Sequence, residues 1–159
     1  MRRFAVLACV LLLVCSSFLP ALSRADLERV LDFSVTLKTV SAAAAGGAVL
    51  PANRLLLLEG SIGEVVVLDD RPQAWKVRVE LVAGEWIGTD EVRGYHCWVT
   101  FAGPEYAEIF PAEVPDEPPP SYLPRHARVL VLARALAPVV TPLGEKVMTV
   151  EGLAVRPSR

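Results

Sequence analysis

The sequence has few cysteines and few histidines. Of its three cysteines only Cys97 lies beyond the first fifteen residues, and its two histidines are His96 and His126. A zinc site needs three or four His, Cys or carboxylate ligands at workable spacing, as in a CxxC or HxxxH motif, and neither motif is present. We therefore expect no metal site, no cofactor and, once the first residues are removed, no disulfide within the chain.

The common catalytic motifs are absent as well. There is no GxSxG motif and no glycine-rich phosphate-binding loop of the Walker or dinucleotide type. The acid pairs at 69–70 and 90–91 lie in turn-like sequence, whereas glycoside hydrolysis needs two carboxylates across a cleft. We expect the chain not to be an enzyme, and a hydrolase site assembled from loops is the less favoured alternative.

Residues 1–25 have the features of a secretory signal peptide. Arg2 and Arg3 precede an apolar run over residues 4–14, and Pro20 and small residues follow it. Cleavage is expected after Ser23 or Ala25. The alternative is an uncleaved anchor, because this stretch is just long enough to span a bilayer. No later run is long and apolar enough, so we expect a periplasmic or secreted protein with no membrane span in the mature chain.

Cleavage after Ala25 would leave 134 residues with a formal net charge of −5. That length fits a single domain that can bury a core without disulfides. Because nonspecific binding to polyanions depends mainly on neutralising phosphates, the acidic charge argues against it. On this ground the sequence predicts no specific nucleic-acid partner.

The alternation of apolar and polar residues predicts an all-β chain. Residues 31–39 alternate at period two and are predicted to form a strand. The small residues at 41–48 predict a flexible loop. Residues 26–53 therefore form an N-terminal segment that precedes the main domain. The domain, 54–159, contains five further expected strands, and Gly60 and Gly63 predict a bulge or bend in the first of them. These strands are expected at residues 54–68, 75–86, 95–102, 127–136 and 146–156.

Residues 104–124 hold seven of the thirteen prolines among five acidic residues. Such a run cannot form a central strand or helix, so we expect an extended, partly polyproline-II crossover that lies against the barrel. The alternative is a ligand for a proline-recognising partner.

Five strands of this length are too few for a large sandwich, and a small barrel of five to six strands best removes their edges. The glycine-bent first strand, the long connection after the third strand, and the closing pattern ARVLVLARALAPVVTPLGEKVMTVEGLAVRP resemble an OB-fold over residues 54–157. OB-folds often have a helix where this chain has the proline-rich run, which leaves an SH3-like barrel or an immunoglobulin-like sandwich open.

Parity divides residues 95–101 between two faces of a strand. Cys97 shares the apolar face with Tyr95, Val99 and Phe101, whereas His96 and Trp98 point to the other side. Without a bulge between them, His96 and Cys97 therefore cannot hold one metal or act as a catalytic pair. Free cysteines facing a core behave as small hydrophobes.

The OB resemblance implies that ligands bind the outer face of the second and third strands and the adjacent loops. We therefore expect an exported, non-enzymatic binding module whose partner is a protein or a small anionic or glycan ligand. A structural component of an envelope complex is the alternative function. The alternative for this face is that it binds no ligand: Trp98 is then covered by the proline-rich segment or by residues 31–39, and the charged side chains only keep the sheet surface solvated. The predicted ligand-binding residues are Lys76, Arg78, Trp86, His96 and Trp98.

The signal-peptide prediction has a direct test. After expression in a bacterium with a general secretory pathway, intact-mass measurement of the exported protein should give the mass of residues 24–159 or 26–159. Recovery of the full 159-residue mass in the membrane fraction would contradict cleavage and indicate an anchor.

Overall fold

The computed structural model describes residues 24–46, 50–51, 53–140, 144 and 146–158. The expected signal peptide lies almost wholly outside the described residues and stays a prediction. The described chain begins with helix α2 (Arg24–Val30). Within the described residues, no helix is long and apolar enough to cross a membrane.

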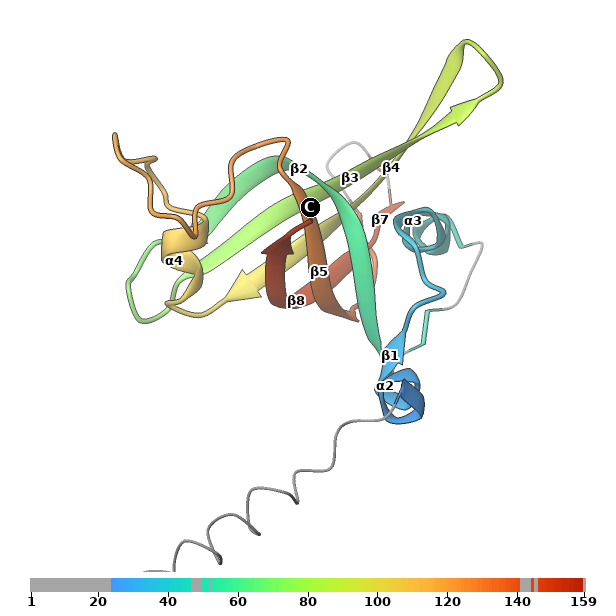
Figure 1. The fold of residues 1–159 in the computed structure, drawn as a ribbon, viewed down its shortest axis with the longest axis horizontal. Helices are drawn as coiled ribbons and strands as arrows, with labels where there is room; N and C mark the ends of the chain where they lie inside the picture. The colour runs from blue at the N-terminus through green and yellow to red at the C-terminus, as the bar shows by residue number, and fades with distance from the viewer. Residues whose placement is uncertain (1–23, 47–49, 52, 141–143, 145, 159) are drawn as a thin grey trace, which may run out of the picture.

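Five strands close into a barrel, as Figure 1 shows. They follow the order β2, β3, β4, β8, β5, and β5 pairs back with β2. Strands β4 and β8 run parallel, whereas the other barrel pairs are antiparallel. This confirms the expected small, OB-like, all-β barrel. The strands are β2 (Leu55–Asp69), β3 (Lys76–Ile87), β4 (Glu91–Ala102), β5 (Arg128–Ala135) and β8 (Thr149–Pro157).

The described part of the structure has three further strands, each of two residues. Strand β1 (Leu31–Asp32) pairs in parallel with the start of β2. Strands β6 (Val139–Val140) and β7 (Lys146–Val147) form a separate two-stranded sheet. None of the three contributes to barrel closure.

Because the sequence alternates at period two, every second side chain of a barrel strand points into the barrel. Cys97, Val99 and Phe101 of β4 are buried, as the parity of residues 95–101 predicts. The other strands supply Leu56, Leu58, Ile62, Val77, Val79, Leu81, Val129, Val131, Ala133, Val150 and Val155 to the same core.

Strand β2 pairs with two neighbouring strands because it bends. Its first half, Leu55 to Ser61, pairs with β5, and its second half pairs with β3 from Ser61 onward. The register shifts between Ile62 and Val65, which brackets Gly63. The expected bulge is confirmed, and it lets one strand turn the corner of the barrel.

The predicted strand over residues 31–39 and the flexible loop over 41–48 are wrong in large part. Only Leu31–Asp32 are strand, and helix α3 (Leu37–Ala44) occupies most of the rest. The Thr36 side chain caps this helix by accepting a hydrogen bond from the Thr39 backbone N–H. Alanines favour helix, and residues 37, 40 and 44 then share the buried face, so helical spacing prevails over the period-two pattern.

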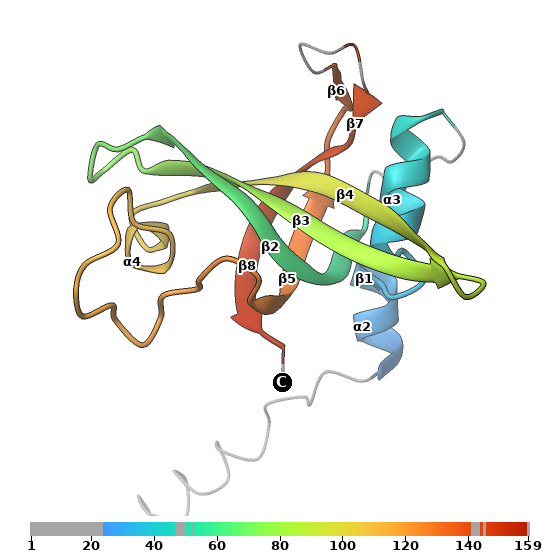
Figure 2. The ribbon, with the colours of Figure 1, turned by 90° about the horizontal axis from the view of Figure 1, so that it is seen from above.

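The two ends of the barrel are covered by different segments. Helix α3 lies beside β4 at one end, and the start of the proline-rich crossover lies at the other (Figure 2). Contrary to expectation the crossover contains one helical turn, α4 (Tyr106–Ile109). The ring centroids of Tyr106 and Phe110 lie 4.8 and 5.5 Å from that of Phe101, so the crossover contributes to the core.

Gly152 of β8 is required by close packing. A Cβ atom at this position would overlap the Phe101 ring. We expect Gly152→Ala to lower the free energy of unfolding by about 1–3 kcal/mol, because overpacking shifts a fully buried ring. Urea denaturation measures the effect. The control is Gly94→Ala, where an added Cβ meets nothing within 4 Å. Equal stability of the two variants would contradict the packing at Phe101.

Candidate ligand-binding face

One face of the hairpin formed by β3 and β4 carries all five predicted site residues. The register pairs even-numbered residues with even-numbered residues, so their side chains share the outer face of the barrel. We call this set the outer strip. It consists of Lys76, Arg78, Glu80, Val82 and Trp86 on β3, and of Val92, His96, Trp98 and Thr100 on β4.

Arg78 and Trp98 form the centre of the outer strip. The Arg78 guanidinium carbon lies 4.9 Å from the centroid of the Trp98 ring, and both side chains are half-buried. The Nε of Arg78 is buried without a hydrogen-bond partner. Among the described residues Arg78 makes no ion pair, so the stacked guanidinium keeps a positive charge that no carboxylate neutralises directly.

His96 and Glu80 lie beside this stack. The Nδ1 of His96 and the Oε1 of Glu80 are 2.9 Å apart. Glu80 pairs with Trp98 across the strands and is only 23% exposed, whereas His96 is 41% exposed. The pair limits the rotation of both side chains and places a carboxylate next to the stack, which reduces the local positive charge.

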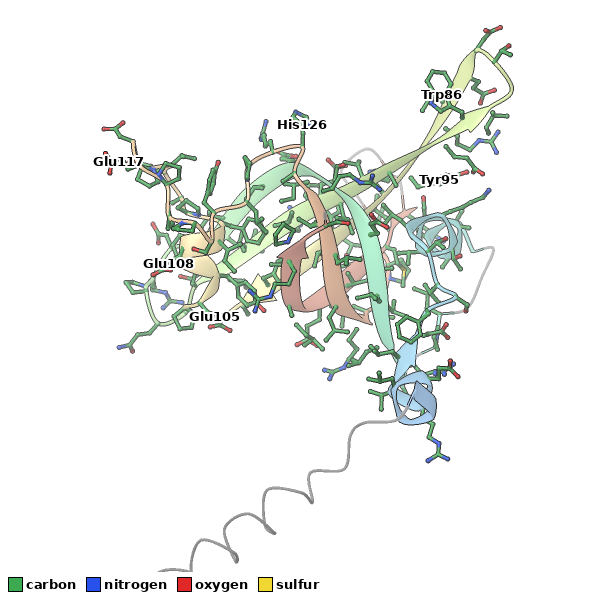
Figure 3. All side chains as sticks on the ribbon, viewed as in Figure 1. Trp86, Tyr95, Glu105, Glu108, Glu117 and His126 are labelled. Atoms are coloured by element: carbon green, nitrogen blue, oxygen red, sulfur yellow. The ribbon has the colours of Figure 1, made fainter. Side chains whose placement is uncertain are left out.

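Trp86 stands near the end of the hairpin, as Figure 3 shows. The strands predicted at 75–86 and 95–102 leave a long loop between them, and this loop is wrong in large part. Strand β3 continues to Ile87, strand β4 begins at Glu91, and Trp86 pairs with Val92. Trp86 is 70% exposed and presents a bare indole surface to solvent.

Helix α3 holds the base of the hairpin. Lys38 Nζ and the Tyr95 hydroxyl each donate to Glu85 Oε2 over 2.7 Å. The hydrogen bond from Lys38 lowers the pKa of Glu85 most, and the hydrogen bond from Tyr95 lowers it further. The bond between Lys38 and Glu85 also raises the pKa of Lys38. Each contact is exposed and weak alone, but together they orient the hairpin on the barrel.

A groove of about 750 Å³ lies beside the base of the hairpin, where Ala83, Glu85 and Tyr95 line it from the face opposite the outer strip and Val82 borders it from the outer strip. Residues 33–38 form one wall, and parts of β2, β3 and β5 form the other. Its two cations are neutralised within the chain, Lys38 by Glu85 at 2.7 Å and Arg128 by Glu59 at 2.9 Å. An anionic ligand therefore finds fewer available cations in this groove than on the outer strip.

The structure brings together three of the five predicted residues. Arg78, Trp98 and His96 form one cluster, whereas Lys76 and Trp86 stand at opposite ends of β3. Ten residues of strand separate these two, which corresponds to about 33 Å. The five residues fit an extended ligand and not one small molecule, and their binding role stays a prediction.

Sequence reasoning missed the length of the hairpin and the contacts of Lys38, Glu85 and Tyr95. The sequence does contain a signal for the hairpin, because a glycine, Gly88, opens a three-residue turn between strand-like residues. In the structure Gly88 has a φ of +67°, a conformation that favours glycine. Lys38 and Glu85 are 47 residues apart in the sequence, and Glu85 and Tyr95 are 10 apart. No local sequence pattern predicts contacts over such separations.

No protein-family model and no curated protein matches this sequence. Two solved structures are similar in fold. One is a small single-stranded DNA-binding protein from Streptomyces coelicolor, with 11% identity and a TM-score of 0.44 over 65% of this chain and 92% of that chain. The other is a small single-stranded DNA binding protein from Mycoplasma pneumoniae, with 11% identity and a TM-score of 0.43 over 66% and 93%.

These similarities contradict two expectations drawn from the sequence. The expectations of a binding module for other ligands and of no specific nucleic-acid partner are corrected here, because both similar structures are of single-stranded DNA-binding proteins. This comparison does not test export, which stays a prediction. The physical error lies in the use of net charge. It sums over the whole surface, whereas stacking on aromatic side chains depends on one face alone.

Cys97 gives a test of the strand parity that defines the outer strip. It is fully buried, and burial raises the pKa of its thiol to about 12. At pH 8 the thiolate fraction is then about a thousandfold below that of an unperturbed thiol. The test uses a chain with Cys9→Ser and Cys15→Ser, so that Cys97 is the thiol that reacts. We expect a thiol reagent to react about a hundredfold or more faster in denaturant than in buffer. The ratio is set below a thousandfold because local opening of the folded protein also exposes the thiol. Equal rates would place Cys97 on the outer face.

Proposed function

We propose that this protein binds single-stranded nucleic acid along the outer strip. The observation that carries the proposal is the Arg78 and Trp98 stack on the same face as the exposed Trp86. Barrels of this class bind extended ligands on the corresponding strands. Fold alone does not assign a function, so the argument rests on these side chains.

The chemistry of the outer strip fits the two parts of a nucleotide. An indole surface stacks on any base, which is worth about 1–3 kcal/mol per base when measured by alanine substitution. Neither Arg78 nor the exposed Lys76 makes an ion pair among the described residues, so both charges are available to attract a phosphate. Stacking with phosphate contacts is the combination that nonspecific single-strand binding requires.

The length of the outer strip supports a polymer as the ligand. Trp98 lies in the row of Glu80, six residues of β3 away from Trp86. Six residues of strand span about 20 Å, which is more than one nucleotide can cover. A strand that contacts both tryptophans therefore runs along the hairpin.

The charge of the protein determines how such binding responds to salt. Lys76 and Arg78 make no ion pair within the described part of the chain, although Asp69 lies opposite Lys76 in the register and Glu80 lies on the outer strip itself. Two phosphate contacts predict a slope of log affinity against log salt of about −1.4 for a single strand. Stacking should therefore supply most of the affinity.

The proposal is for binding without catalysis, and the thiol of Cys97 is a poor nucleophile because it is buried and its pKa is raised. It does not depend on the compartment. Export of the chain remains a prediction from residues 1–25, and cleavage of that segment would leave the outer strip intact.

The test is fluorescence anisotropy with a labelled oligodeoxythymidine and the purified protein. We expect wild-type protein to bind with the shallow salt slope given above, and Trp98→Ala to raise Kd by about 5- to 150-fold. Arg78→Gln should weaken binding and reduce the magnitude of the salt slope by about half, since one of two cations is lost.

Two matched variants control for general effects. Trp98→Phe keeps an aromatic ring and should retain most of the affinity, and Arg156→Gln removes an exposed cation on β8, away from the outer strip. Circular dichroism establishes that each variant is folded. Wild-type protein that does not bind, or a Trp98→Ala variant that is folded and binds normally, would refute the proposal.

A further inference from the structure

The end of the hairpin has an unused edge. Strand β4 pairs with β3 along its whole length, Glu91–Ala102, but with β8 only at residues 98–100. Among the described residues, positions 91–97 therefore have no strand on their second edge. Unpaired edges expose N–H and C=O groups that can pair with another chain, and a two-stranded hairpin alone is marginally stable.

This edge lies next to exposed apolar surface. Trp86 is 70% exposed and Val92 is 53% exposed, and the two residues pair in one row of the hairpin. Figure 1 shows the hairpin projecting from the barrel, where helix α3 reaches only its base. An apolar row beside an unpaired edge is the combination expected of an interface.

The charges beside Val92 indicate what the edge binds. Glu91 and Arg93 flank Val92 and point to the opposite face of the strand. Within one chain their side chains are 3.7 Å apart and remain 65% and 56% exposed. An acid and a base on either side of one residue make a strand that is self-complementary when a copy runs antiparallel to it.

We propose that two copies of this chain pair antiparallel through the free edge of β4, with the two-fold axis at Val92. Val92 then faces the partner's Val92. Glu91 lies opposite the partner's Arg93, and Arg93 lies opposite the partner's Glu91. Opposite charges across strands stabilise such pairing, and the interface is isologous, so it closes as a dimer.

The same charges disfavour the two neighbouring same-face registers. An axis at Arg93 would place Arg93 directly opposite the partner's Arg93, and an axis at Glu91 would place two carboxylates together. Like charges directly opposite one another destabilise a strand pair. An axis at Val92 avoids both arrangements and also joins the apolar rows.

Pairing in this register keeps the outer faces of both hairpins on one side. Val92 and the partner's Val92 would lie between Trp86 and the partner's Trp86, so that the two outer strips meet in a single surface. This consequence rests on the proposed function. The dimer itself does not, because it depends only on the edge of β4.

The experiment compares oligomeric state by light scattering and sedimentation over a concentration series. Wild-type protein should be a dimer that dissociates on dilution, since a short edge buries a small area. Glu91→Arg alone and Arg93→Glu alone should each shift the protein to monomer. An equimolar mixture of the two single variants should restore the dimer, because one carries only bases and the other only acids beside Val92.

The mixture separates pairing between chains from the weak contact within one chain, which is absent in both single variants. The control Arg134→Gln removes an exposed cation on β5 that pairs with Glu151 and should leave the dimer intact. A wild-type protein that stays monomeric, single variants that stay dimeric, or a mixture that stays monomeric would each overturn the proposal. Oligonucleotide binding by the monomeric variants is measured separately, so failure of the dimer and failure of the proposed function are distinguishable.

Discussion

Closure of the barrel depends on the bend in β2. This strand pairs with β5 before Ser61 and with β3 after it, and the bulge at Gly63 provides the change of direction. A Cβ at Gly60 would lie 2.8 Å from the Leu81 side chain and 2.9 Å from the Val82 carbonyl oxygen, so the two strands approach closely only because glycine is there. Without this corner, β5 and β3 could not both pair with β2, and the outer strip would lose its support.

The bend also explains why the hairpin leaves the barrel. Because β2 turns toward β5, β3 has no β2 partner beyond Val82, and β3 and β4 continue together to the turn at Gly88. The side of the hairpin that carries Glu85 and Tyr95 rests on α3 through Lys38, and the other side carries the outer strip. The groove, whose two cations are neutralised, and the outer strip, whose Arg78 and Lys76 make no ion pair among the described residues, thus present different chemistry on either side of the hairpin.

The sequence alone predicts the barrel well and the hairpin poorly. The barrel strands alternate strictly, as in residues 76–81, and burial of one face enforces that alternation, so strand positions and the burial of Cys97 follow from pattern. Outside the barrel no such constraint acts. Residues 84–94 have glycines and exposed aromatic and charged side chains, which resemble a loop. Residues 31–39 alternate like a strand, but the cap at Thr36 and the helical spacing of buried residues over 37–44 favour a helix. The stack of Arg78 on Trp98 is diagonal across two strands, and only the register reveals it.

The three tryptophans allow the central claim to be tested in one measurement. Trp75 is buried in the core, Trp98 is half-buried on the outer strip, and Trp86 is exposed. Indole N–H signals of nitrogen-15-labelled protein, titrated with oligodeoxythymidine, report on all three side chains at once. The account predicts progressive shifts of the Trp98 and Trp86 signals with Trp75 unchanged. Signals that all stay in place, or shifts confined to backbone amides around Lys38 and Tyr95 in the groove, would contradict it.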